Sequence, residues 1–340
     1  MPLSDFDYKL PKHLIAQRPV EPRDSSKLMV LRNEKIQHKT FRDLVGYLEK
    51  GDVLALNDSK VLPVRLYGRK ETGGKVELLL IKRGEGSKWE SLIKGKNIRE
   101  NTKVILGEDR LEGIVKRRIE GGRFEIEFLS EENIEDIIQE IGKMPIPPYI
   151  KEPLVKPERY QTIYANKNGS IAAPTAGLHF TESMLNELKT KGIEIVNITL
   201  HVGLGTFLPV KNHDIKKHKF EPEYFQAYAE TARKINYAKK HGNKIFAVGT
   251  TTVRALESAC NDSREIVETN GESNLFIYPG YEFKTNSDGL LTNFHLPKST
   301  LLMLVSAYAG RDTIMKAYKV AIENSYRFYS FGDAMLIMKG

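Results

Sequence analysis

The stretch KIFAVGTTTVRALESA, residues 244–259, contains the pattern that decides the fold. A short apolar run ends at Gly249, and three threonines, Thr250 to Thr252, lead into a segment whose apolar residues recur at helical spacing. A buried strand that passes through a small-residue turn directly into a helix is one βα unit. The stretch therefore predicts a sheet whose strands are connected by helices.

The chain around this stretch repeats the alternation of helix and strand. Thr181 begins a helix that stops at Gly192, and IEIVNITLHVG follows as a buried strand. The helix AETARKINYAKKHG ends at Gly242, residues 301–308 form a nearly all-apolar helix, and we expect Asp312 to cap an amphipathic one. The apolar stripe of that last helix is Ile314, Ala317, Tyr318, Ala321 and Ile322. Repeated βα units imply an α/β fold with a mostly parallel sheet and helices on its faces.

The segment from about residue 61 to 129 predicts a different structure, a small antiparallel β-barrel. RFEIEF alternates apolar and charged residues, and Gly73–Gly74 and Gly121–Gly122 supply hairpin turns. Five or six such short strands indicate a closed barrel. The segments LIAQ, KLMVL and VLALND precede it and are expected to complete the sheet. We therefore predict a discontinuous α/β domain, residues 1–60 and 147–340, with a barrel domain inserted at residues 61–146.

Composition narrows the class of protein. The 340 residues are 40% apolar and 28% charged, as in ordinary globular proteins, and no run is long and apolar enough for a membrane span. The single Cys260 forms no disulfide framework, which favours a reducing cytoplasm. No CxxC or HExxH occurs, and the pair His213 and His218 stands among lysines, so we expect no metal.

Charge is unevenly distributed along the chain. Lysine and arginine outnumber aspartate and glutamate by 52 to 44, and residues 65–123 contain 16 basic and 9 acidic residues. A local excess of this kind favours a polyanionic partner such as RNA, although a solvated barrel surface explains it equally well.

Candidate site residues follow the predicted strands. Ligands of open α/β sheets gather outside the carboxyl ends of the strands, and four loops there contain small residues, hydroxyls and imidazoles. No dinucleotide or P-loop fingerprint is present. The loop residues are Thr175, Gly177 and His179 in APTAGLHFT; His201, Gly203, Gly205 and Thr206 in HVGLGTF; Thr250, Thr251 and Arg254 in VGTTTVR; and Asn293 and His295 in TNFHLPKST.

Long strings of the chain resemble a known enzyme family. They include NDSKVLPVRLYG, AAPTAGLHFT, LHVGLGTFLPV, VGTTTVRALES, TNFHLPKSTLLMLVSA and YRFYSFGDAMLI, in order from about residue 6 to 337. They closely resemble the S-adenosylmethionine:tRNA ribosyltransferase-isomerases of queuosine biosynthesis. That resemblance implies an α/β domain with an inserted β-barrel. It also implies transfer and isomerisation of the ribosyl part of S-adenosylmethionine onto the aminomethyl group of a 7-deazaguanine at the tRNA wobble position. The products would be epoxyqueuosine in tRNA, adenine and methionine. In HKFEPE the chain departs from the family, with His218 kept and Glu221 where a second histidine is usual.

This chemistry needs a group that removes and returns protons. We expect His179 in that role, with His201 as runner-up and His295 as a third candidate. A helix N-terminus at Thr250 to Thr252, or Arg254, suits the methionine carboxylate. Asp24 or Asp58 would accept hydrogen bonds from the deazaguanine, and Arg117 and Arg118 would contact tRNA phosphates.

Two other classes of function remain open. A non-catalytic RNA-binding protein would bind tRNA regardless of S-adenosylmethionine, whereas an enzyme of free nucleosides would turn over the free base as readily as tRNA. We expect a monomer whose partners are tRNA carrying the 7-aminomethyl-7-deazaguanine precursor and S-adenosylmethionine, a substrate rather than a cofactor.

Overall fold

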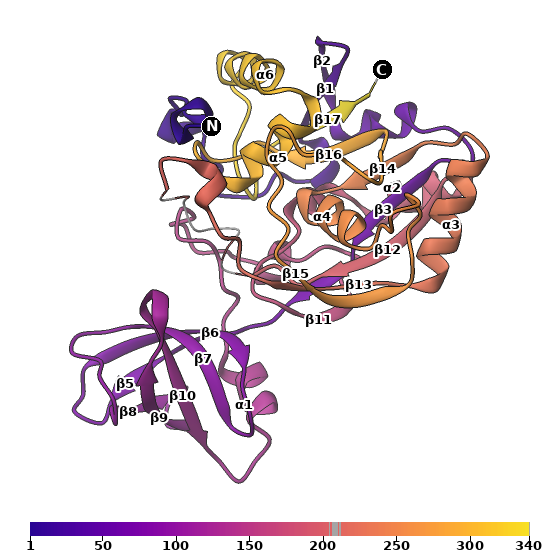
Figure 1. Cartoon of the computed structure of the whole chain (residues 1–340). Coiled ribbons are helices and arrows are strands. Elements are labelled where there is room, and N and C mark those ends of the chain that lie inside the picture. Colours follow the sequence, from indigo (N-terminus) through magenta and orange to yellow (C-terminus); the bar gives the residue numbers. More distant parts are fainter. Residues whose placement is uncertain (204, 206–209, 211, 340) are drawn as a thin grey trace. The chain divides into compact units, whose positions relative to one another are not determined.

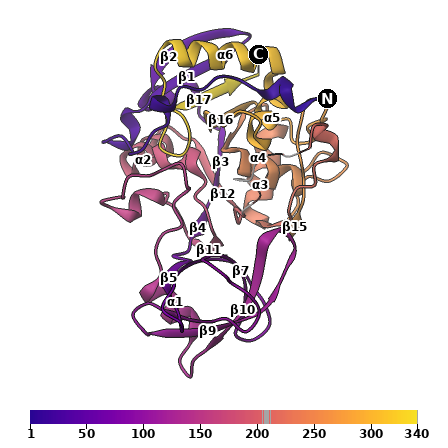
Figure 2. The same ribbon diagram turned by 90° about the vertical axis from the view of Figure 1, so that its left-hand side faces the viewer.

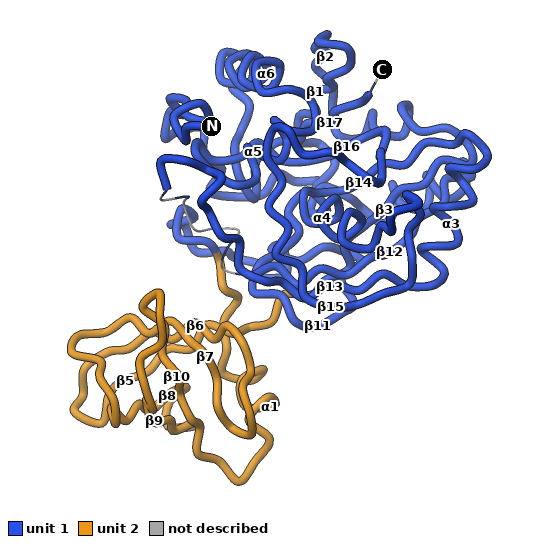
Figure 3. The backbone as a smooth tube through the Cα atoms, viewed as in Figure 1, with its two compact units in different colours: residues 1–60, 147–340 blue, residues 61–146 orange. Residues whose placement is uncertain are grey.

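The structure is a computed structural model that describes residues 1–203, 205, 210 and 212–339. The chain divides into two compact units, which Figure 3 distinguishes by colour. The larger unit contains Met1–Lys60 and Pro147–Gly340, and the barrel unit contains Val61–Ile146.

Among the described residues, a nine-stranded sheet runs through the larger unit in the order β15-β13-β12-β3-β14-β16-β17-β1-β2 (Figures 1 and 2). Its strands are β1 (Lys27–Arg32), β2 (Lys35–Thr40), β3 (Val53–Asn57), β12 (Glu194–Leu200), β13 (Glu223–Ala227), β14 (Ile245–Val248), β15 (Thr269–Ser273), β16 (Gly289–Asn293) and β17 (Ala334–Met338). The four central strands β12, β3, β14 and β16 are mutually parallel, and β1 is parallel to β17. The remaining pairs are antiparallel, so the sheet is mixed.

The α/β class predicted from the sequence is confirmed. Strands from before the barrel, β1 and β3, lie in the same sheet as strands from after it. Three of the central strands, β3, β14 and β16, are buried along their whole length: Val53 and Ala55 of β3 join one apolar cluster, while Leu54 and Leu56 join the other. Burial on both faces explains why these strands read as continuous apolar runs rather than alternating ones.

Helices cover both faces of the sheet. α3 (Ala229–Lys240), α4 (Thr250–Ser258), α5 (Thr300–Ala309) and α6 (Arg311–Glu323) pack into one cluster, and α2 (Glu182–Thr190) packs into the other. The side chain of Thr181 accepts a hydrogen bond from the Met184 N–H at 3.2 Å, and Ser299 caps α5 in the same way. Both caps satisfy N–H groups that have no partner inside the helix.

Two local expectations are wrong. LIAQ forms no strand of the sheet: Ile15 makes a single bridge to Phe328, because β1 is already paired on both sides by β17 and β2. Asp312 does not cap α6. The helix starts from Gly310, whose φ of 89° permits the tight turn from α5, and Asp312 lies inside the first turn, bonded to Arg311.

The barrel unit is a closed antiparallel barrel in the order β10-β7-β6-β5-β8-β9. Its elements are β5 (Arg65–Lys70), β6 (Lys75–Arg83), β7 (Lys88–Lys94), β8 (Lys103–Leu106), β9 (Leu111–Arg118), β10 (Arg123–Leu129) and the helix α1 (Ile134–Ile141). Phe124, Ile126 and Phe128 point inward, as their alternation in RFEIEF predicts.

Short elements complete the described chain. β4 (Ser59–Val61) pairs with β11 (Lys167–Ser170). The 3₁₀ helices are Leu3–Phe6, Lys12–Leu14, Arg23–Ser25, Phe41–Tyr47, Glu120–Gly122, Pro157–Tyr160, Thr175–His179 and Ile215–Lys217. Within the described ranges, none of the helices has the length and apolar character that a membrane crossing requires.

Candidate active site

The carboxyl ends of the four parallel strands meet at one edge of the sheet, because β3, β12, β14 and β16 all run in the same direction. Asn57, the last residue of β3, holds this edge together. Its Nδ2 donates to the carbonyl of Leu200 in β12 at 2.9 Å and to Oγ1 of Thr251 in α4 at 3.1 Å. The strand ends are therefore fixed relative to the start of α4.

The turn from β14 into α4 depends on Gly249. Its φ of 90° lies in the region that side chains disfavour, so the glycine lets the chain turn from the strand directly into the helix. Thr250 and Thr251 are then the first helical residues, and both are more than nine-tenths buried.

A cavity opens at this edge, inside the larger unit. Its lining combines the turn at Gly249, the end of β16, the 3₁₀ helix Thr175–His179 and the start of α5. The described lining contains no charged side chain and several hydroxyls and aromatic rings. It consists of Tyr149, Ala173, Pro174, Thr175, Ala176, Val202, Gly249, Thr250, Thr251, Thr292, Asn293, Phe294, His295, Leu296, Ser299, Leu301, Tyr329 and Ser330.

Of the three candidate histidines, His295 is the one that lines this cavity. Its Nε2 lies 2.9 Å from Oγ1 of Thr292, and its Nδ1 has no hydrogen-bond partner among the described residues. Burial lowers the pKa of His295 to about 3. The ring is therefore neutral at physiological pH, with one nitrogen available to a ligand.

His179 is not among the described lining residues, although it contacts Asn293, which is, and its side chain is buried, with 5% exposed. Its Nδ1 is 2.8 Å from Oγ of Ser26, its Nε2 is 3.2 Å from Nδ2 of Asn293, and its ring stacks on Phe41. Burial, with repulsion from Arg327 and Arg23, lowers its pKa to about 3. Because both ring nitrogens already have protein partners, this placement suits a positioning role better than proton transfer.

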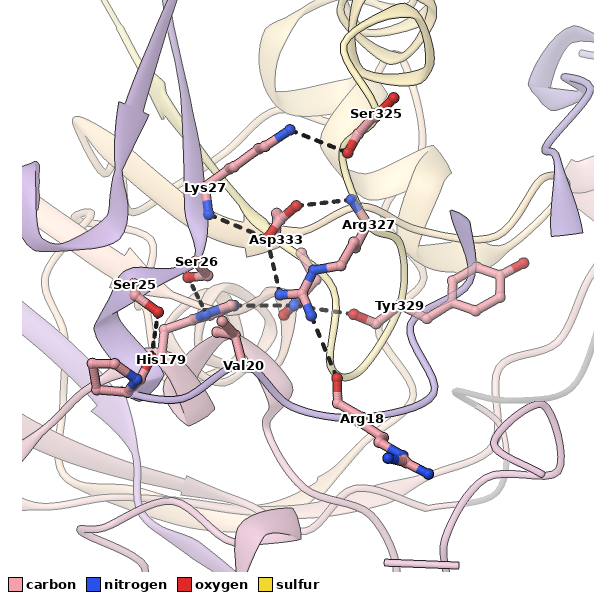
Figure 4. Close-up of polar contacts among 12 residues, drawn as sticks. Arg18, Val20, Ser25, Ser26, Lys27, His179, Ser325, Arg327, Tyr329 and Asp333 are labelled. Atoms are coloured by element: carbon pink, nitrogen blue, oxygen red, sulfur yellow. Dashed lines mark hydrogen bonds and ion pairs between the residues drawn. The ribbon is translucent and has the colours of Figure 1, made fainter. Parts of the chain in front are cut away.

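The surroundings of His179 are anchored by an ion pair (Figure 4). Arg327 lies 3.1 Å from Asp333, which also accepts from the backbone N–H groups of Lys27 and Arg327. A further donor nitrogen of Arg327 lies 3.4 Å from the carbonyl of Arg18. These contacts join the N-terminal segment to the segment before β17.

His201 follows β12 but does not line the cavity. Its Nδ1 lies 2.8 Å from Oγ of Ser59, and its ring stacks on Tyr224. Burial lowers its pKa. A Cβ added at Gly169 would lie 2.5 Å from its Nε2, so the imidazole is packed closely against that glycine.

Gly177 is absent from the described lining of the cavity, and packing explains why it has no side chain. A Cβ at this position would lie 1.9 Å from Oη of Tyr164 and 2.9 Å from Cγ2 of Thr162. Close packing of Tyr164 therefore accounts for the glycine without a ligand, and the expectation that its backbone approaches a ligand stays a prediction. Thr175, two residues earlier, does line the cavity.

The two candidate carboxylates are both buried and both lie outside the cavity lining. Arg42 donates to Oδ2 of Asp24 at 3.0 Å, and Oδ1 of Asp24 has no partner among the described residues. Asp58 accepts from Thr199 at 2.6 Å. Burial raises the pKa of Asp58, while the bond from Thr199 acts in the opposite direction.

Arg254 contacts several other residues of the protein, although its Nη2 has no hydrogen-bond partner among the described residues. It forms a buried ion pair with Glu223 at 2.6 Å, donates to the carbonyl of Leu275 and stacks on Phe220. It does not line the cavity, because its position in α4 turns it toward β13, so its assignment to the methionine carboxylate stays a prediction that this geometry does not favour. Gly203 donates its N–H to the same Glu223 at 2.8 Å.

Gly205 and Thr206 are the two remaining candidate residues in HVGLGTF. A Cβ at Gly205 would have Glu221 and Phe220 as its nearest neighbours. Thr206 lies outside the described residues.

The barrel unit is nearly neutral as a whole. It contains 17 basic and 16 acidic residues, because the acidic stretch that follows residue 123 belongs to the same unit. Arg117 pairs with Glu125 at 3.0 Å, and Arg110 pairs with Glu132 and Glu140. Arg118 lies over the ring of Phe124. The larger unit holds the remaining 35 basic and 28 acidic residues, so the excess charge of the chain lies there.

Several lining residues were not candidates from the sequence: Tyr149, Thr292, Ser299, Tyr329 and Ser330. Tyr149 and Ser330 are joined by a 2.6 Å hydrogen bond, although 181 residues separate them. Tyr329 and Ser330 belong to YRFYSFGDAMLI, one of the strings that resemble the enzyme family, so that resemblance could have identified them as site residues. No group of three or more His, Cys, Asp or Glu side chains in the described part of the chain is placed to hold a metal ion.

Comparison with known proteins gives a single result. Residues 3–337 match the family described as queuosine biosynthesis protein. The chain is 50% identical over 343 residues to an S-adenosylmethionine:tRNA ribosyltransferase-isomerase of Desulforamulus reducens, covering 99% of this chain and 100% of the relative. It is 52% identical over 342 residues to the protein of the same name in Clostridioides difficile, again with 99% and 100% coverage.

A solved structure is also similar. The crystal structure of an S-adenosylmethionine tRNA ribosyltransferase from Thermotoga maritima matches with a TM-score of 0.56 and 40% sequence identity, covering 98% of this chain and 100% of that one. With a family match that spans almost every residue and relatives at half identity over their full lengths, the chain belongs to the queuosine biosynthesis protein family.

Proposed function

We propose that this protein is an S-adenosylmethionine:tRNA ribosyltransferase-isomerase. It transfers the ribosyl part of S-adenosylmethionine to the aminomethyl group of 7-aminomethyl-7-deazaguanine at the wobble position of tRNA and isomerises it. Epoxyqueuosine in tRNA, adenine and methionine are the products. Full-length similarity to relatives of that name supports the assignment.

We place the reaction in the cavity of the larger unit and assign proton transfer to His295. The observation that carries this choice is that His295 lines the cavity with Nδ1 unpartnered among the described residues. His179 has partners on both ring nitrogens, and His201 lies outside the lining. A proton-transfer group must reach the reacting atoms, and His295 meets that condition.

The reaction requires a group that removes a proton from the ribosyl part and then donates one to the departing base. The sulfonium charge acidifies the C5′ hydrogens, so the neutral imidazole of His295 can remove one. The imidazolium that forms is a strong acid because burial disfavours its charge, and it can protonate the departing adenine. The neutral aminomethyl nitrogen then bonds to a carbon of the ribosyl group and loses a proton to solvent. The bond between the ribosyl group and the sulfonium sulfur breaks, and its electron pair leaves with methionine as the epoxide closes.

The methionine carboxylate fits the start of α4. The N–H groups of the first turn of a helix have no partner within the helix, and the dipole favours an anion there. Gly249, Thr250 and Thr251 all line the cavity at this point. The activated sulfonium supplies the driving force, so we propose that no resident cofactor or metal is needed, and that the enzyme acts as a cytoplasmic monomer.

The test is incubation with S-adenosylmethionine, labelled separately in its adenine and methionine parts, and tRNA carrying the precursor base. We expect adenine, methionine and modified nucleoside in equal amounts. Binding of tRNA without release of adenine would instead indicate a non-catalytic RNA-binding protein. Equal turnover of the free base would indicate an enzyme of small nucleosides.

A further inference from the structure

The amide of Asn293 has one possible orientation. One edge of the amide lies 3.2 Å from the carbonyl oxygen of Tyr329, which can only accept a hydrogen bond. That edge is therefore the NH₂ group. The other edge, Oδ1, accepts from the hydroxyl of Thr175 at 3.1 Å.

This orientation determines which ring nitrogen of His179 carries the hydrogen. The same NH₂ group lies 3.2 Å from Nε2 of His179, so Nε2 must be the ring nitrogen without hydrogen. In a neutral ring the hydrogen is then on Nδ1, which donates to Oγ of Ser26 at 2.8 Å. His179 is thus a fixed acceptor that keeps the nitrogen edge of Asn293 turned away from the cavity.

The oxygen edge of Asn293 is left for the ligand. Asn293 and Thr175 both line the cavity, whereas His179 does not. A carbonyl oxygen has two lone pairs, and Thr175 uses one of them. The other can accept an N–H donor, and the aromatic side chains of Phe294 and Tyr329 in the same lining offer apolar surface to a flat base that carries such a donor.

We propose that Oδ1 of Asn293 accepts a hydrogen bond from the 6-amino group of the adenine of S-adenosylmethionine, and that His179 is a positioning residue that holds Asn293 in this orientation. The assignment rests on the proposed function, since it names the substrate group that the same cavity recognises. Neither residue transfers a proton. A 6-oxo base would present a carbonyl oxygen to Oδ1, and two acceptors facing each other repel.

The first test measures binding of S-adenosylmethionine and of its 6-oxo analogue, S-inosylmethionine, by calorimetry. The wild type should prefer the 6-amino ligand by roughly ten- to a hundredfold, the usual range for one buried hydrogen bond lost. Asn293→Leu should abolish the preference. His179→Phe keeps the stacking on Phe41 but cannot accept from Asn293, so it should reduce the preference severalfold. His179→Gln can accept and should restore it.

A matched control is His241→Phe, which removes a histidine whose Nδ1 bonds to the carbonyl of Tyr237. It should leave the preference unchanged. Equal affinity of the wild type for both ligands would overturn the proposal. So would a preference that His179→Phe and His179→Gln leave as it is in the wild type.

The second test reads the tautomer of His179 directly by NMR of protein with ¹⁵N-labelled histidine, with the resonance assigned by its loss in His179→Gln. We expect a neutral ring protonated on Nδ1, and a ring protonated on Nε2 would contradict the proposal. This measurement needs no turnover and no folded His179→Phe. If tRNA assays show no adenine release, the proposed function fails, while the tautomer and the ligand preference are still decided.

Discussion

At the residue scale, the three histidines differ in the hydrogen-bond partners of their ring nitrogens and in whether they line the cavity. His295→Ala should lower turnover by roughly a hundredfold or more, the usual worth of a general base, while tRNA affinity is unchanged. His201→Ala should lower it less than tenfold, since His201 contacts Ser59 and Tyr224 rather than the cavity. Single-turnover kinetics of both variants decide between them. If His295→Ala keeps a normal single-turnover rate and His201→Ala does not, proton transfer must be assigned to His201.

Gly177 offers a second prediction at this scale. Gly177→Ala should destabilise the fold by roughly 1–3 kcal/mol, because its Cβ would lie 1.9 Å from Oη of Tyr164. That hydroxyl has no hydrogen-bond partner among the described residues, so Tyr164→Phe alone should cost little. The double variant should recover part of the loss in urea unfolding. If Gly177→Ala is stable but inactive, the glycine serves the ligand after all.

At the scale of elements, α4 is joined to β13 by the ion pair of Arg254 and Glu223. Arg254→Met removes the positive charge that faces the buried carboxylate of Glu223 and should cost about 3–5 kcal/mol. Glu223→Gln keeps an oxygen for the N–H of Gly203 and removes the charge, so the double variant should be more stable than Arg254→Met. Denaturant unfolding measures the difference. Loss of activity in Arg254→Met at full stability would return Arg254 to the list of ligand-binding residues.

At the scale of the whole molecule, the balanced charge of the barrel unit bears on tRNA binding. Arg118 has no carboxylate partner among the described residues, whereas Arg117 is paired with Glu125. If the barrel contacts phosphates, Arg118→Ala should reduce the slope of log affinity against log salt by about one, and Arg117→Ala by less. Filter binding over a range of salt measures both. Unchanged slopes in both variants would place the phosphate contacts on the larger unit, where the excess of positive charge lies.

The buried histidines also predict an acid sensitivity of the whole fold. Burial lowers the pKa values of His179 and His295 to about 3, below the ordinary value of 6.5. Between these pH values the unfolded chain binds protons that the folded chain excludes, so stability falls as pH falls from about 6.5 toward 3. At pH 5 each histidine should lower the free energy of unfolding by about 2 kcal/mol. Asp58 acts in the opposite sense, since burial raises its pKa. Replacing both histidines with glutamine should remove most of the loss, and an unaltered pH profile would count against their burial as neutral rings.

Some features of this protein could be determined from the sequence alone. The strand, turn and helix of residues 244–259, the alternation in RFEIEF and the cap at Thr181 depend on local periodicity and on the chemistry of single residues. The α/β class with an inserted barrel followed from them and is confirmed. The loops at the strand ends were identified for the same reason, because parallel strands place their carboxyl ends at one edge.

The tertiary structure decided which residues of those loops face the cavity. His179 and His295 look alike in sequence, yet one has both ring nitrogens bonded and the other has one free, since partners such as Ser26 and Asn293 arrive from 153 and 114 residues away. Arg254 is neutralised by Glu223, and the basic stretch of the barrel by the acidic stretch after it. Local pattern determines which element forms. Which atoms remain free for a ligand depends on contacts between residues far apart in the chain, and only the folded molecule brings these together.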